Sequence, residues 1–317
     1  NRMNVFQFAL DHNFDCATHW PRVREAIPEL RRRGTVLAMG GHNMHMFMTA
    51  EDLKQHPDWG PFYGGRRQTR GQFCTRNEQA VAHYIDGLKG WLRDNPEVEY
   101  FAPWPNDTGG WCECELCRDT PMPDRFMQLG QRIHRELAAA APHVRVTHFA
   151  YGSHVEPPRV ERPLPGMPIT LCTWGRDLSQ PFASEGTPAG FRQALSSWLA
   201  ICREANVPMI LHEKYARHLY TGHHTMPVPV MQEDLQWFRS QGLSGFELPM
   251  AYMGRRTKGL NLYTLTHLMW DADVPLDELW DDYFAEEYGP LAGHMRPLYE
   301  SLARAADDFR YSFDNYS

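Results

Sequence analysis

The chain has 317 residues, of which 42% are hydrophobic and 22% charged, a composition typical of a globular protein and not of a disordered one. Its 39 acidic residues outnumber 32 basic ones, and no dense basic stretch interleaves with aromatic residues, so we expect no nucleic-acid partner. No apolar segment approaches the roughly 20 residues that a membrane-spanning helix needs, so we expect no membrane partner either.

Short apolar runs alternate with amphipathic segments along most of the chain. Alternation of this kind predicts parallel strands joined by crossover helices, and we expect a (β/α)8 barrel of the TIM type. Only seven strands are found, so we expect the first strand of the barrel to lie upstream of this chain. The seven predicted strands are residues 4–10, 35–39, 98–102, 144–150, 169–172, 208–211 and 245–248.

Four segments between these strands have apolar residues on one helical face. The first of them starts with Thr75 and Glu78, which have the spacing of a capping box. From Leu260 onward the chain is mainly helical in pattern. We therefore predict a barrel domain over residues 1–258 and a helical part over residues 259–317 that packs on it. The apolar positions of the four helices are Val81, Tyr84, Ile85, Leu88 and Leu92; Phe126, Leu129, Ile133 and Leu137; Phe191, Leu195, Trp198, Leu199 and Cys202; and Leu235 and Phe238.

The ends of the predicted strands carry polar and aromatic residues that a core would not hold. Barrel enzymes of this type place their catalytic groups there. Asp107, Glu213 and Glu247 lie at the ends of three of the strands, and we expect them to converge as the acid/base set of a glycosidase, which needs two carboxyl functions around the scissile bond. Aromatic rings pack on sugar faces, and the predicted substrate contacts are His42, Trp104, Tyr151, Trp174, Tyr215 and Tyr252.

Three of the seven cysteines lie close together, as Cys112-x-Cys114-x-x-Cys117. They could supply three thiolates to a structural zinc, completed by Cys74 or by a histidine. The same cysteines could instead form disulfides that fix the loop carrying Asp107. Both alternatives are structural, and we expect no cofactor to be required for catalysis.

Two other functions fit the same residues. One is a metal-dependent hydrolase of an ester or amide substituent of a glycan, with His42, His45 and His223 as ligands beside a carboxylate. The other is a barrel that binds carbohydrate without cleaving it, in which the aromatic residues persist but no pair of carboxylates spans a bound sugar.

One stretch resembles a known family. Pro105-Asn106-Asp107, followed by Gly110-Trp111 and the cysteine motif, resembles the signature of the bacterial domain-of-unknown-function 4838 group. The resemblance extends to His56-Pro57, to Phe149-Ala150-Tyr151 and to Leu268-Met269-Trp270-Asp271.

That group is similar to glycoside hydrolase family 163, whose members are endo-β-N-acetylglucosaminidases acting on complex N-glycans. The resemblance implies a carbohydrate substrate cleaved at β-N-acetylglucosamine, with the 2-acetamido group of the sugar as the nucleophile. In such a mechanism Asp107 is the acid and Asn106 is a substrate-binding residue that orients the acetamide. A secreted or periplasmic location is also implied.

Overall fold

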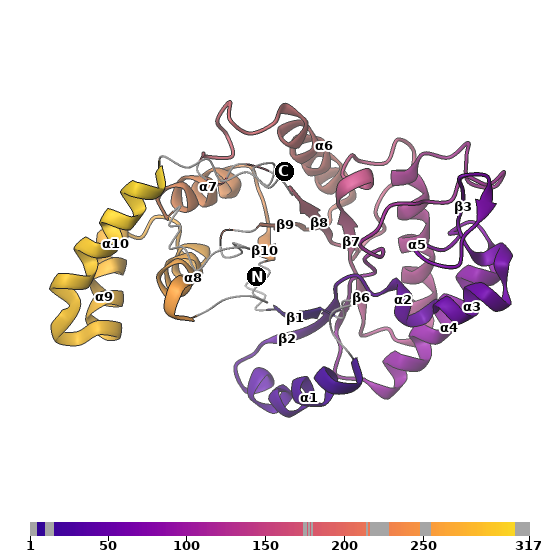
Figure 1. Cartoon of the computed structure of the whole chain (residues 1–317), viewed down its shortest axis with the longest axis horizontal. Helices are drawn as coiled ribbons and strands as arrows, with labels where there is room; N and C mark the ends of the chain where they lie inside the picture. Colours follow the sequence, from indigo (N-terminus) through magenta and orange to yellow (C-terminus); the bar gives the residue numbers. More distant parts are fainter. Residues whose placement is uncertain are drawn as a thin grey trace. The chain divides into compact units, whose positions relative to one another are not determined.

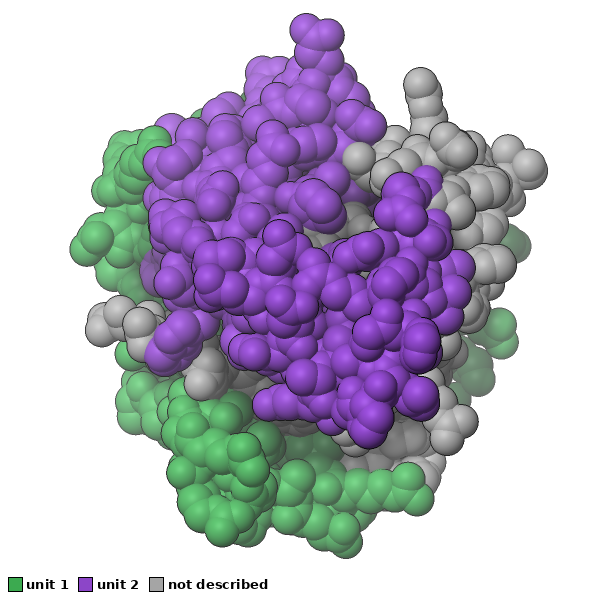
Figure 2. Space-filling view, turned by 90° about the vertical axis from the view of Figure 1, so that its left-hand side faces the viewer, with its two compact units in different colours: residues 1–169, 201–207 green, residues 170–200, 208–317 purple. Residues whose placement is uncertain are grey.

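The computed structural model describes residues 5–9, 16–173, 176, 178, 180–213, 215, 228–247 and 255–307. Strands and helices alternate along this part of the chain, as Figure 1 shows. Six of the seven predicted strands are present, each within two residues of its expected bounds, and the predicted strand 144–150 is divided into β6 (Arg145–Val146) and β7 (His148–Ala150). The chain divides into two compact units, coloured green and purple in Figure 2.

The first unit comprises residues 1–169 and 201–207 and contains a parallel sheet. The strand order is β1-β2-β5-β6. A further strand, β7, follows β6 after Thr147, whose N–H donates to the carbonyl of Phe101 at 2.9 Å. Every strand is short, so the loops after them begin close to the sheet. The bounds are β1 (Val5–Ala9), β2 (Val36–Gly40), β5 (Tyr100–Phe101), β6 (Arg145–Val146) and β7 (His148–Ala150).

Helices of the first unit pack their apolar faces into one core with the sheet. Two of the long helices, α4 and α5, lie side by side (Figure 1). The start of α4 differs from the capping-box prediction at Thr75. Asn77 is the N-cap, and its side chain accepts from the N–H groups of Gln79 and Ala80. The helices are α1 (Cys16–Arg32), α2 (Met44–Phe47), α3 (Ala50–Gln55), η1 (Pro57–Trp59), α4 (Glu78–Asp94), α5 (Met122–Ala140) and η2 (Gly152–His154).

A small hairpin of the first unit was not predicted. Strands β3 (Phe62–Tyr63) and β4 (Arg66–Arg67) are antiparallel and joined by Gly64 and Gly65. Both glycines have positive φ, at 59° and 78°, as a two-residue hairpin turn requires. The Gly-Gly pair was the sequence signal for this turn.

The second unit comprises residues 170–200 and 208–317. Its strands are neighbours in the order β10-β9-β8, and β10 is parallel to β9. Helices α9 and α10 lie side by side in Figure 1. The bounds are β8 (Ile169–Cys172), α6 (Ala189–Ala205), β9 (Met209–His212), α7 (Val228–Ser240), β10 (Gly245–Glu247), α8 (Arg255–Trp270), α9 (Leu276–Tyr288), η3 (Gly289–Leu291) and α10 (Ala292–Asp307).

The parallel strands and alternating helices confirm the predicted α/β class, and α8, α9 and α10 confirm the helical end of the chain. Closure into an eight-stranded barrel, a first strand upstream of the chain and a domain boundary after residue 258 stay predictions. Among the described residues, no helix combines the length and apolar character needed to cross a bilayer.

Candidate functional site

Asp107 and His42 face each other from two strand-end loops of the first unit. His42 follows β2 and Asp107 follows β5, and Nε2 of His42 lies 3.8 Å from Oδ1 of Asp107. The other ring nitrogen, Nδ1, lies 2.5 Å from the carbonyl oxygen of Pro105. A carbonyl only accepts, so Nδ1 donates to it and Nε2 is the ring nitrogen that faces Asp107. The Asp107 side chain is 51% exposed, which leaves it open to a substrate.

Hydrogen bonds to its backbone hold the loop that carries Asp107 in place. The buried Gln72 donates to the carbonyls of Asn106 and Thr108, at 2.6 and 3.0 Å, and accepts from the N–H of Asn106. The Asn106 side chain donates to the carbonyl of Gly71 at 2.6 Å and accepts from the N–H of His45 at 3.0 Å. These contacts favour a positioning role for Asn106, whose predicted substrate contact stays a prediction.

Aromatic side chains line the same strand ends. Trp104 stacks on Phe149 with ring centroids 3.8 Å apart, and His42 meets Trp104 edge to face at 5.5 Å. The ring centroid of Tyr151, which follows β7, lies 5.4 Å from that of Phe149 and 6.4 Å from that of His42. Trp104 is buried whereas Tyr151 is half-buried, so Tyr151 is the better placed of the two to meet a sugar ring.

Two histidines are buried beside this aromatic wall. Burial lowers the pKa of His148 to about 3. The pKa of His154 is also lowered to about 3, mainly by burial and to a smaller extent by the nearby His148 and His42. His154 packs on the ring of Phe126 at 4.6 Å and lies near Tyr151. Both imidazoles are therefore neutral at neutral pH and belong to the packed interior behind the site.

Four cysteine side chains meet beside the hairpin. Cys74, Cys112, Cys114 and Cys117 are buried, and their sulfur atoms all lie within 4.8 Å of one another. The hydrogen bonds of the Cys117 and Cys74 thiols lower the pKa of Cys112, and the N–H of Phe62 acts in the same direction. Among the residues that the structure describes, this is the one group of His, Cys, Asp and Glu side chains close enough to share a metal ion.

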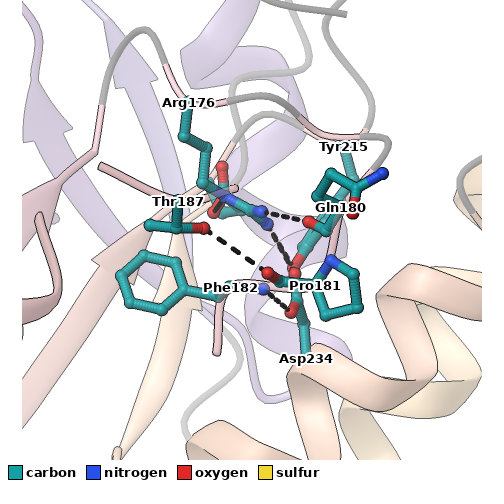
Figure 3. A network of polar contacts seen from close by, with 8 residues as sticks. Arg176, Gln180, Pro181, Phe182, Thr187, Tyr215 and Asp234 are labelled. Carbon is teal, nitrogen blue, oxygen red and sulfur yellow. Dashed lines mark hydrogen bonds and ion pairs between the residues drawn. The ribbon is translucent and has the colours of Figure 1, made fainter. Parts of the chain in front are cut away.

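The second unit holds a buried polar network around Arg176 (Figure 3). Its Nε donates to Glu213 at 2.8 Å, and its Nη2 donates to Asp234 at 2.5 Å and to the Tyr215 hydroxyl at 3.0 Å. Nη1 donates to the carbonyl of Gln180 at 3.0 Å. Tyr215 in turn donates to Asp234. This network ties the end of β9 to α7.

Burial and charge act against each other in this network. Burial alone would lower the pKa of Arg176, but the charges of Glu213, Tyr215 and Asp234 raise it above its ordinary value. Burial also raises the pKa of Asp234, although the Arg176 charge opposes that rise. Glu213 and Tyr215 thus have interior partners, and their predicted contacts with substrate stay predictions.

Glu247 differs from Glu213 in its surroundings. Its Oε1 lies 3.1 Å from Nδ1 of His212, and its side chain is 18% exposed against 2% for Glu213. Glu213 follows β9 and Glu247 is the last residue of the neighbouring β10, and the N–H of Glu213 donates to the carbonyl of Glu247 at 3.1 Å. Glu247 is thus the more accessible of the two predicted carboxylates in this unit.

The predicted set is divided between the units. Asp107 belongs to the first unit and Glu213 and Glu247 to the second, so their convergence stays a prediction. Trp174, Tyr252 and His223 lie outside the described residues. Residues that sequence reasoning missed are Gln72, Arg176 and Asp234.

Comparisons with known proteins identify a family. A model described as a domain of unknown function (DUF4838) matches residues 5–300. The chain belongs to this family. No curated protein matches the sequence.

Several solved structures of glycoside hydrolases are distantly similar to the chain. Endo-glycoceramidase II from Rhodococcus sp. is 13% identical with a TM-score of 0.48, over 79% of this chain and 66% of its own. A GH5 lichenase from Caldicellulosiruptor sp. F32 is 12% identical with a TM-score of 0.44, over 79% and 73%. A GH5 xyloglucan-specific endo-β-1,4-glucanase from a metagenomic library is 11% identical with a TM-score of 0.48, over 87% and 83%.

Proposed function

We propose that the chain is a glycoside hydrolase in which Asp107 is the proton donor. The observation that carries the proposal is an exposed carboxylate on a loop whose backbone is fixed by the buried Gln72. A general acid needs both features, because it must reach the leaving oxygen and must already be in place when the bond breaks. His42 lies opposite Asp107, and Nε2 of its ring faces the Asp107 carboxyl.

The second carboxyl function is assigned to Glu247. It is half-buried, it follows a strand end and it is oriented by His212, as a base or stabilising carboxylate should be. Tyr151 supplies the aromatic contact to the sugar. In the finer form of the proposal, the cleaved sugar is β-N-acetylglucosamine, and its own acetamide takes the place of a carboxylate nucleophile, as the likeness to glycoside hydrolase family 163 implies.

The test compares Asp107→Asn with Asp119→Asn, using aryl glycosides and glycans. Asp119 lies on the same loop, and its carboxylate is 87% exposed, so it controls for the loss of one negative charge. We expect Asp107→Asn to lower kcat/KM on glycans by roughly 10²- to 10⁴-fold, the usual contribution of a general acid, and Asp119→Asn to leave it unchanged.

The leaving group separates acid catalysis from a general loss of function. A dinitrophenolate departs without protonation, so a dinitrophenyl glycoside should lose far less activity in Asp107→Asn than a glycan does. An equal loss on both substrates would remove Asp107 from the role of donor. Glycan binding without turnover by the intact chain would favour the non-catalytic alternative.

A further inference from the structure

Two sulfur–sulfur distances in the four-cysteine group match the edge of a metal tetrahedron, and all four sulfurs lie within 4.8 Å of one another. Sγ of Cys74 lies 3.8 Å from that of Cys114 and 3.7 Å from that of Cys117. Four sulfurs about 2.3 Å from a central zinc lie about 3.8 Å from one another, because a tetrahedron's edge is about 1.63 times its centre-to-corner distance. A disulfide needs about 2.05 Å, and one sulfur cannot pair with two others.

The backbone directs these side chains toward one point. The N–H groups of Cys117 and Arg118 both donate to the carbonyl of Cys114, at 2.8 and 2.9 Å, which forms a tight turn within Cys112-x-Cys114-x-x-Cys117. Cys74 comes from a separate segment, and its N–H donates to the carbonyl of Trp59 at 2.7 Å. Three ligands on one turn and one from a distant segment would make a metal here a cross-link within the chain.

Donors around the cluster suit negatively charged sulfur. The N–H of Phe62 lies 3.3 Å from Sγ of Cys112, and Nη1 of Arg67 lies 3.7 Å from the same atom. Four thiolates and one divalent cation leave a net charge of −2. A neighbouring guanidinium and an N–H group pointing at sulfur offset that charge, as outer-shell groups do around metal ligands.

We propose that Cys74, Cys112, Cys114 and Cys117 form a structural zinc site that anchors the loop carrying Asp107. All four positions of the tetrahedron are filled by protein ligands, which is the arrangement of a structural and not a catalytic zinc. Cys74 and Gln72 belong to the same segment, and Gln72 holds the backbone of the loop at Asn106. Zinc binding at Cys74 therefore fixes the segment on which that loop rests.

The first experiment uses the unaltered full chain, purified under reducing conditions without chelator. Metal analysis should find about one zinc per chain, released when a mercurial reagent modifies the thiols. Replacement of zinc by Co²⁺ should give the intense visible absorption of tetrahedral thiolate coordination. A chain that holds iron, that contains disulfides among these cysteines by mass spectrometry, or that binds no metal would overturn the proposal.

Variants test the ligand set. Cys117→Ser should lose most of the zinc, whereas Cys202→Ser, which changes another buried cysteine outside the cluster, should retain it. Cys117→His keeps a ligand that zinc accepts and should retain the metal, which guards against a variant that merely fails to fold. Full zinc content in Cys117→Ser would show that the ligand set is wrong.

Hydrogen exchange tests the anchoring role. After removal of zinc by a strong chelator, amides of residues 104–111 and 71–74 should exchange at least tenfold faster, while those of α9 should keep their rates. Unchanged protection of residues 104–111 in a chain shown to have lost its zinc would refute the link to this loop. This readout involves no enzymatic activity, so it stands whether or not the chain hydrolyses glycosides.

Discussion

Replacing Arg176 by Met should cost the second unit about 3–5 kcal/mol of unfolding free energy. Arg176 is buried, and its guanidinium donates to Glu213, to Asp234, to the hydroxyl of Tyr215 and to one backbone carbonyl. The Met side chain fills a similar volume but donates nothing, so two buried carboxylates lose their counter-charge. Loss of one member of a buried ion pair has this cost because the remaining charge stays in the interior without compensation.

A matched control is Arg239→Met. Arg239 pairs with Asp273 at 2.6 Å in the same unit, but both side chains are more than half exposed, so its removal should leave the stability of the unit nearly unchanged. Native-state hydrogen exchange of the amides in α7 and β9 measures both values without assuming that the two units unfold together. Equal costs for Arg176→Met and Arg239→Met would refute the view that the buried network holds this unit together.

Three further predictions concern the first unit. Burial holds the pKa of His154 at about 3, below its unfolded value near 6.5, so the stability that depends on neutral His154 is fully present above pH 6.5 and is lost as the pH falls. His154→Phe should remove about 2 kcal/mol of this loss between pH 6.5 and 5. A melting temperature of His154→Phe with the same pH dependence as that of the unaltered chain would contradict this. Asp124 accepts from three successive N–H groups of residues 159–161, so Asp124→Asn should cost about 2–3 kcal/mol in urea unfolding, and a loss below about 0.5 kcal/mol would refute that role. Gln72→Leu removes three hydrogen bonds to the loop and should speed amide exchange at Asn106 and its neighbours by at least tenfold; intact protection would show that the loop is held by other contacts.

Periodicity was sufficient to find the main elements. Apolar residues at helical spacing located α4, α5, α6 and α7, and short apolar runs located the seven strands, because both patterns follow from which face of each element is buried. The exact ends of the helices were harder to predict from the sequence. The start of α4 depended on whether Thr75 or Asn77 caps it, and both residue types are good caps, so only the backbone geometry decides.

Long-range polar contacts could not be predicted from the sequence. Asp234 lies on α7 and Arg176 follows β8, and nothing in either local sequence marks the other as its partner. The role of Gln72 likewise could not be predicted, because its side chain hydrogen-bonds to the backbone of a loop in a different part of the sequence. The cysteines were found because their spacing is a local pattern, although the choice of Cys74 as the fourth member needed the fold.

The contacts of Asn106 bear on how an acetamide could be oriented. An orienting group must offer the substrate a free donor or acceptor. The side-chain oxygen of Asn106 accepts from the N–H of His45 and its nitrogen donates to Gly71, so one lone pair of the oxygen and one N–H hydrogen are left for a substrate. The predicted substrate contact of Asn106 is therefore compatible with its positioning role beside Asp107.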